Sequence, residues 1–171
     1  MLCKNEFAYN CKKRTQRLAY LRNIVLEQAK LWSECDYLIM LDMDFISFDK
    51  KEFKNMFNII NTNHNIDGIF GMSVNKNKQF YDIGAIRPKN KILNLFLNNN
   101  LIKVSSAFSG FGIYRMKSIK NIKYNTKTNN IEHIDFNKKL NNIYIYLPFK
   151  PMYEGSSNLI INILINHHHQ Y

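Results

Sequence analysis

Apolar residues recur at helical spacing in three parts of the chain. Between Thr15 and Trp32 they fall close to every 3.6 residues, with no Gly or Pro among them, which predicts a helix over 15–32. A second helix is predicted over 50–60, where apolar side chains follow an i, i+3, i+4, i+7 pattern after a potential cap at Asp49. A third is predicted over 134–140.

An uninterrupted apolar run follows the first helix. Asp36–Leu41 has the length of a strand and no polar alternation, which favours a strand buried on both faces at the centre of a sheet. Further strands are expected over 68–72, 80–86, 104–108, 112–114 and 143–147, with a brief helix over 91–97, and Pro148 and Pro151 are expected to end regular structure. Helices that alternate with strands predict the α/β class.

Length and composition restrict the domain count and the compartment. The 171 residues, 46% of them hydrophobic, suit one domain over 1–150 followed by a C-terminal extension over 151–171. The 3 cysteines include no C-x-x-C pair, so we expect neither a disulfide framework nor a zinc ribbon, and a reducing compartment. Because no signal peptide or membrane span is recognisable, we expect a cytoplasmic protein, including the host cytoplasm or a viral factory.

Two carboxylates stand directly after the predicted central strand. Asp42 and Asp44 are two residues apart and so point the same way from an extended segment. Open α/β sheets bind ligands at the carboxyl ends of their strands, and two oxygen ligands on one side suit Mg²⁺ or Mn²⁺. The alternative is a pair of solvated turn acids.

Five segments, taken in order, resemble GT-A-fold glycosyltransferases, including the fungal capsular mannosyltransferase type and glycosyltransferases of large DNA viruses. The first two are Arg14-x-x-Arg17-Leu-Ala-x-x-Arg22-Asn23, similar to an R-x-x-R-L-A-x-x-R-N helix, and Asp36–Asp44, similar to the D-x-D strand. The others are Tyr81-Asp82-x-x-Ala85-x-Arg87, the glycine-bearing loop 106–114, and Glu132-His133-x-x-Phe136. The resemblance runs from Arg14 to about Pro148 and implies a Rossmann-like mixed sheet flanked by helices.

The same resemblance implies a role for each matching residue. Asp44 would bind Mn²⁺ or Mg²⁺, Asp42 would bind the metal or the donor's ribose, and His133 could complete the metal shell. Glu132 would be the general base of an inverting reaction. The expected donor-binding residues are Arg14, Arg22, Asn23, Asp82 and Arg87, and the expected acceptor-side residues are Gly110, Phe111 and Gly112.

Each of these residues also has a structural interpretation. Arg17 is expected to be an exposed charge, and Arg22 and Asn23 could support the fold as readily as the donor. Glu132 and His133 could stabilise the start of a helix, Asp82 and Arg87 could form a local ion pair, and the glycines could serve an ordinary turn. The His167–His169 run is expected to lie in a tail.

The sequence departs from the family at its start, because only 13 residues precede Arg14 where the family has a strand-helix-strand region for the nucleotide base. Either residues 7–11 supply a minimal strand or the fold is N-terminally shortened, which would expose a sheet edge to a second copy or a partner chain.

The expected function is therefore a metal-dependent transfer of a sugar from a nucleotide-sugar donor to a glycan or glycoprotein acceptor. The alternatives are a catalytically inactive glycosyltransferase-like remnant and, from the net charge of +11, a basic nucleic-acid-binding domain. Because the basic residues are dispersed and match no nucleic-acid-binding motif, we expect no nucleic acid as partner.

Overall fold

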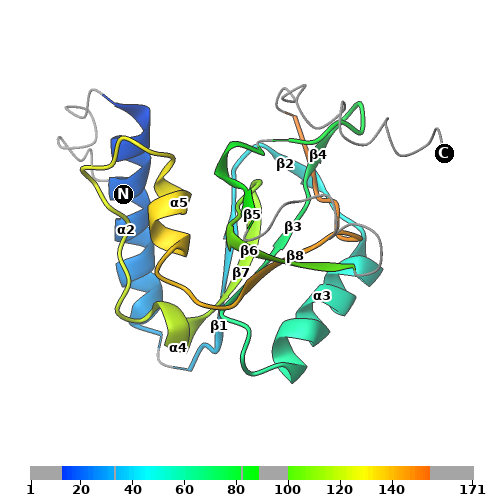
Figure 1. Cartoon of the computed structure of the whole chain (residues 1–171), viewed down its shortest axis with the longest axis horizontal. Helices are drawn as coiled ribbons and strands as arrows, with labels where there is room; N and C mark the ends of the chain where they lie inside the picture. The colour runs from blue at the N-terminus through cyan, green and yellow to red at the C-terminus, as the bar shows by residue number, and fades with distance from the viewer. Residues whose placement is uncertain (1–12, 33, 82, 89–99, 155–171) are drawn as a thin grey trace.

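The computed structural model describes residues 13–32, 34–81, 83–88 and 100–154. Its helices are α2 (Arg14–Lys30), α3 (Lys50–Thr62), α4 (Met116–Ile119) and α5 (Glu132–Asn137), with a 3₁₀ turn η1 (Ile83–Ala85) (Figure 1). Its strands are β1 (Tyr37–Leu41), β2 (Phe45–Ser47), β3 (Gly68–Gly71), β4 (Val74–Asn75), β5 (Arg87–Pro88), β6 (Leu101–Ser106), β7 (Phe111–Arg115), β8 (Ile143–Tyr146) and β9 (Met152–Tyr153).

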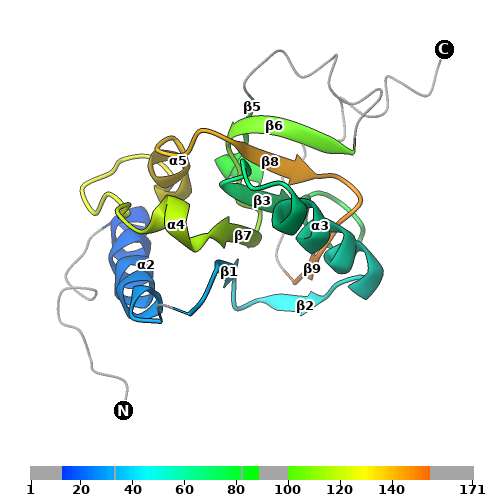
Figure 2. The same ribbon diagram turned by 90° about the horizontal axis from the view of Figure 1, so that it is seen from below.

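The main sheet is mixed, and helices cover both of its faces. Its six strands follow the order β1-β7-β3-β8-β6-β5, in which β3 and β8 are parallel and the other neighbours are antiparallel. A smaller sheet has the order β2-β9-β4. Figures 1 and 2 show α2, α4 and α5 grouped apart from α3, with the main sheet between them. The predicted α/β class, with a mixed sheet flanked by helices, is confirmed.

Two apolar clusters form the core, one on each face of the main sheet. In β3, Phe70 packs with α2 and α5 residues, including Leu26 and Phe136, whereas Ile69 packs with Met56 of α3. Neighbouring residues of a strand point to opposite faces, so the fully buried β3 contributes to both clusters. Because both faces of β3 are covered, all four of its residues are buried.

The predicted position of one strand is wrong. Residues 37–41 form β1 as a strand, but β1 lies at the edge of the sheet and pairs only with β7 among the described residues. Ile39 and Leu41 are 46% and 43% exposed. A short apolar run indicates that a segment is hydrophobic, but it does not indicate how many strands pair with that segment. The run therefore could not distinguish an edge strand from a central strand.

Some of the other predicted helices and strands are confirmed, and others are wrong. The first two helices are confirmed, and Asp49 caps α3 by accepting hydrogen bonds from the backbone N–H groups of Lys51 and Glu52. The strand predicted over 80–86 is wrong, because this segment contains η1 and single bridge residues. Pro151 does not end regular structure, since β9 follows it and pairs with β2 and β4. The helix predicted over 91–97 lies outside the described residues.

Within the described residues, no helix has both the length and the apolar character that a membrane crossing requires.

Candidate functional site

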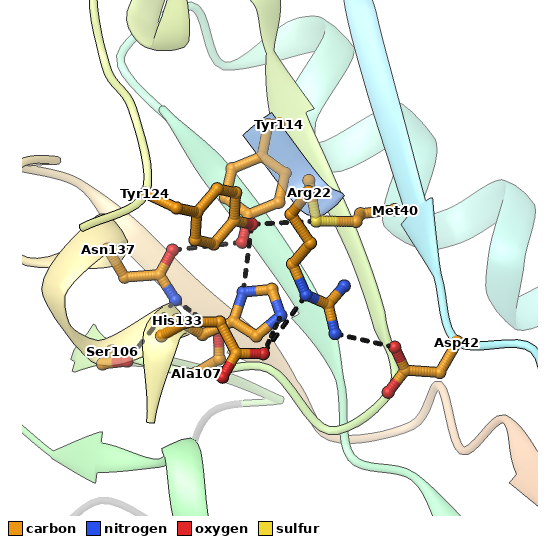
Figure 3. A network of polar contacts seen from close by, with 10 residues as sticks. Arg22, Met40, Asp42, Ser106, Ala107, Tyr114, Tyr124, His133 and Asn137 are labelled. Carbon is orange, nitrogen blue, oxygen red and sulfur yellow. Dashed lines mark hydrogen bonds and ion pairs between the residues drawn. The ribbon is translucent and has the colours of Figure 1, made fainter. Parts of the chain in front are cut away.

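An arginine joins two of the predicted site carboxylates at the carboxyl end of β1. The Arg22 guanidinium donates to Asp42 Oδ1 through Nη2 at 3.0 Å and to Glu132 Oε1 through Nε at 3.2 Å. Arg22 comes from α2, Asp42 follows β1 and Glu132 begins α5. Three segments far apart in the sequence thus meet at one guanidinium, part of which Figure 3 shows.

The surroundings of Arg22 explain why it can hold both acids. Its side chain is 16% exposed, and its guanidinium carbon lies 5.1 Å from the centre of the Phe108 ring, a distance at which the ring attracts a cation. Burial raises the pKa of Asp42, while the charge and hydrogen bond of Arg22 act in the opposite direction. Asp42 is therefore a partly desolvated carboxylate that depends on its partner.

His133 lies beside this ion pair, in the interior. Its ring stacks on Phe108 with centroids 3.7 Å apart, and its Nδ1 is 3.2 Å from the Tyr124 hydroxyl (Figure 3). Its Nε2 atom is buried without a hydrogen-bond partner among the described residues and lies 3.9 Å from Glu132 Oε1. Desolvation, assisted by the Arg22 charge, lowers the pKa of His133 well below its usual value. The imidazole is consequently neutral at physiological pH.

Two stacked tyrosines hold the other half of the D-x-D turn. Tyr81 and Tyr153 lie with ring centroids 4.7 Å apart and an interplanar angle of 7°. The Tyr81 hydroxyl donates to Asp44 Oδ2 at 2.6 Å, and the Tyr153 hydroxyl donates to the Gly110 carbonyl at 2.6 Å. That carbonyl also accepts from the Asp42 backbone N–H at 2.9 Å. Both aspartates are thus tied, directly or through Gly110, to one aromatic pair.

The glycine-bearing loop is part of this arrangement. Gly110 has φ +87°, a left-handed conformation, and a Cβ placed there would lie 2.6 Å from the Tyr153 ring. Phe111 and Gly112 lie in β7 opposite Leu41 and Met40. Phe111 is 3% exposed, and a Cβ on Gly112 would meet the Phe70 ring. Contact of these residues with an acceptor stays a prediction.

The remaining predicted donor residues are placed as follows. Asn23 forms two hydrogen bonds with the backbone of Tyr124, accepting from its N–H at 2.7 Å and donating to its carbonyl at 3.0 Å, which is a fold-supporting role. Arg14 is exposed, as is Arg17, and the charge of Arg14 opposes the burial that raises the pKa of Asp42. The Arg87 guanidinium donates to the carbonyls of residues 84 and 86. Asp82 lies outside the described residues.

The described part of the chain contains no group of three or more His, Cys, Asp and Glu side chains arranged to hold a metal ion. Asp42 and Asp44 nevertheless offer two carboxylates on one turn, a donor set that suits a cation completing its shell with water and phosphate oxygens. His133 as a third ligand stays a prediction.

Sequence reasoning missed four contributors to the site. Phe108, Tyr124 and Tyr153 were assigned no role, although they contact Arg22, His133 and Gly110. Tyr81 opens one of the segments that resemble the glycosyltransferases, so its place in that segment was a usable signal. No spacing rule links Tyr124 or Tyr153 to residues that are distant in the sequence.

Comparisons with known proteins bear on the fold. No protein-family model matches the chain, and no curated protein matches it in sequence. Among solved structures, it is similar to A197 from STIV, a viral protein, with a TM-score of 0.53 and 20% identity. The similarity covers 78% of this chain and 65% of A197, so the chain spans less than two thirds of that protein. The similarity supports the α/β architecture. Any argument about chemistry therefore rests on the residues of the site.

Proposed function

We propose that this chain is a metal-dependent glycosyltransferase that moves a sugar from a nucleotide-sugar donor to a glycan or glycoprotein acceptor. The observation that carries the proposal is the meeting of Asp42 and Glu132 at one guanidinium, beside Asp44 at the carboxyl end of β1. The similarity to A197 from STIV supports the α/β architecture on which the proposal is built.

The D-x-D turn would hold the divalent cation. Asp42 engages Arg22 through Oδ1, and Asp44 engages Tyr81 through Oδ2, so each carboxylate has a second oxygen to offer a ligand. Mg²⁺ and Mn²⁺ commonly bind one or two carboxylates together with substrate phosphates. Bound there, such a cation would offset the charge of the diphosphate leaving group.

The other steps of donor binding and sugar transfer would be carried out by residues of the chain itself. Arg22 would keep Asp42 oriented and place a positive charge beside the diphosphate. In an inverting reaction, the acceptor oxygen forms a bond to the anomeric carbon while the bond from that carbon to the diphosphate oxygen breaks. The nucleoside diphosphate leaves with the electron pair. Glu132 would take the proton of the acceptor hydroxyl, and the Phe108–His133 stack beside it would exclude water.

Thermal-shift titration of the purified chain with Mn²⁺ and a panel of uridine- and guanosine-diphosphate sugars tests the proposal. A ligand that binds the native state raises the Tm. We expect one donor to raise the Tm only when Mn²⁺ is present, and Asp44→Asn to abolish the shift.

Glu154→Gln is the matched control, because Glu154 is an exposed acid whose backbone N–H binds the Asp44 carbonyl at 3.2 Å. It should keep the full shift. The absence of any donor shift in a folded sample would favour the inactive remnant, whereas binding without transfer to any acceptor would limit the proposal to the donor site.

A further inference from the structure

The exposed large apolar side chains of the described residues are confined to one stretch of the sequence. All of them fall between residues 21 and 48, on α2, on β1 and on the segment around β2. Figure 2 shows α2, β1 and β2 along one border of the ribbon, with α4 and α5 beside α2 on its inner side. Where exposed apolar side chains form a contiguous patch, the patch commonly marks a protein interface.

The α2 part of this surface has the geometry of a helix-packing face. Leu21, Ile24 and Val25 lie on α2, and Leu31 and Trp32 directly follow its last residue, Lys30. The five recur at helical spacing, and we call them the α2 stripe. The buried face of α2 carries Ala19 and Leu26 instead. Within the stripe, Val25 is 62% and Trp32 is 70% exposed. The helix therefore packs one face on the core, and its opposite face carries the α2 stripe, interrupted by exposed Gln28, which nothing in the described structure covers.

The charges at the two ends of the stripe are complementary to each other. Exposed Arg17 precedes the stripe, and the first turn of α2 contains no acidic residue. Exposed Asp36 follows the stripe. If two copies of α2 pack antiparallel, the basic end of each helix meets the acidic end of the other, twice by symmetry. The same contact places carboxylates near a helix N-terminus, where the helix dipole favours negative charge.

We propose that the α2 stripe is the interface of a two-fold symmetric dimer of this chain, with the two α2 helices antiparallel. A two-fold axis near the middle of the stripe sets Leu21 of one copy against Trp32 of the other, and Val25 lies close to the axis. An interface of this type is isologous, because the same patch serves both copies. The proposal is independent of the glycosyl-transfer chemistry, since Asp42, Asp44 and Glu132 are not part of the stripe.

Sedimentation velocity of the full chain over a wide concentration range tests the proposal. We expect a reversible species of twice the chain mass of 20.3 kDa. Val25→Glu, which places two like charges close to the axis, should raise the dimer dissociation constant by on the order of a hundredfold. Because Val25 is exposed in the single chain, the variant should keep the Tm that the wild type has at concentrations where it is monomeric. Asn58→Glu, on the exposed surface of α3, is the matched control and should leave the dimer unchanged.

A charge exchange tests the antiparallel arrangement itself. Arg17→Asp should weaken the dimer by about threefold to tenfold, the range expected of paired surface charges. Adding Asp36→Arg to the same chain should restore the affinity, because each copy then presents the exchanged pair. A monomer at every concentration, or a dimer that Val25→Glu leaves intact, would overturn the proposal. Loss without recovery in the double variant would overturn the antiparallel pairing.

Discussion

The Tyr81 hydroxyl lies 2.6 Å from Asp44 Oδ2 and donates a hydrogen bond to it. Tyr81 comes from the segment after β4, and Asp44 stands between β1 and β2. The Tyr81 ring is held against Tyr153, and Tyr153 in turn binds the carbonyl that accepts from the Asp42 N–H. The Tyr81 hydroxyl thus fixes the Asp44 carboxylate. The Gly110 carbonyl, itself bound by the Tyr153 hydroxyl, fixes the Asp42 backbone.

Tyr81→Phe should weaken metal-dependent donor binding while leaving the chain folded. The change removes one hydrogen bond to a carboxylate and keeps the stacked ring, so Asp44 loses its orientation but not its packing. Such a bond contributes about 1.5–3 kcal/mol at most, and we expect a donor dissociation constant raised by roughly tenfold in the presence of Mn²⁺.

Isothermal titration with the donor identified by thermal shift would measure this change. Tyr146→Phe is the matched control, because the Tyr146 hydroxyl donates to the Glu52 carboxylate at 2.9 Å, outside the site. Equal losses in the two variants would mean that Tyr81 acts on general stability and not on Asp44.

Gly110→Ala should destabilise the protein by about 2–4 kcal/mol, because it combines a disfavoured backbone conformation with a steric clash. The residue has φ +87°, and the added Cβ would lie 2.6 Å from the Tyr153 ring. Urea unfolding would measure the loss. Gly68→Ala is the comparison, since its Cβ would be no closer than 3.3 Å to a side-chain atom. A Gly110 variant no less stable than the Gly68 variant would contradict the prediction.

The sequence predicted the features that depend on residues close together in the chain, and missed those that depend on contacts between distant segments. Periodicity and capping are local, so α2 and α3 could be predicted, including the Asp49 cap. The position of β1 at the edge could not, because strand order depends on pairings between distant segments. The same holds within the site. The sequence indicated Asp42 and Glu132 separately, but their common partner Arg22 emerges only once α2, β1 and α5 are packed together.

Arg22→Ala should cost about 2–4 kcal/mol of stability at neutral pH, because it leaves two poorly solvated carboxylates without their cation. Glu132 is 4% and Asp42 is 24% exposed at the side chain. Since burial raises and Arg22 lowers the pKa of Asp42, removing Arg22 raises that pKa further.

A raised carboxyl pKa favours the protonated folded state, so its contribution to stability is present at low pH and lost as the pH rises. The cost of Arg22→Ala should therefore be smaller near about pH 4 than at neutral pH, as urea unfolding at the two values would reveal. Arg17→Ala, which removes an exposed arginine from the same helix, is the control and should cost little at either pH. A cost of Arg22→Ala that does not change with pH would show that packing on Phe108, and not charge pairing, is what Arg22 supplies.

The neutral His133 should make the protein less stable in mild acid. Its pKa is well below the usual value in the folded chain, so the unfolded chain takes up this proton first as the pH falls. The stability that the neutral form contributes is complete above the unfolded pKa of about 6.5 and is lost as the pH falls toward the folded pKa. The slope from this one group approaches roughly 1.4 kcal/mol per pH unit.

His133→Phe would keep an aromatic ring against Phe108 and remove the titrating group. Its free energy of unfolding should fall less steeply between about pH 6.5 and pH 5 than that of the wild type, measured by urea unfolding at intervals across this range. If the His133 variant keeps the wild-type slope, the acid sensitivity belongs to other groups and the imidazole is already charged in the folded chain.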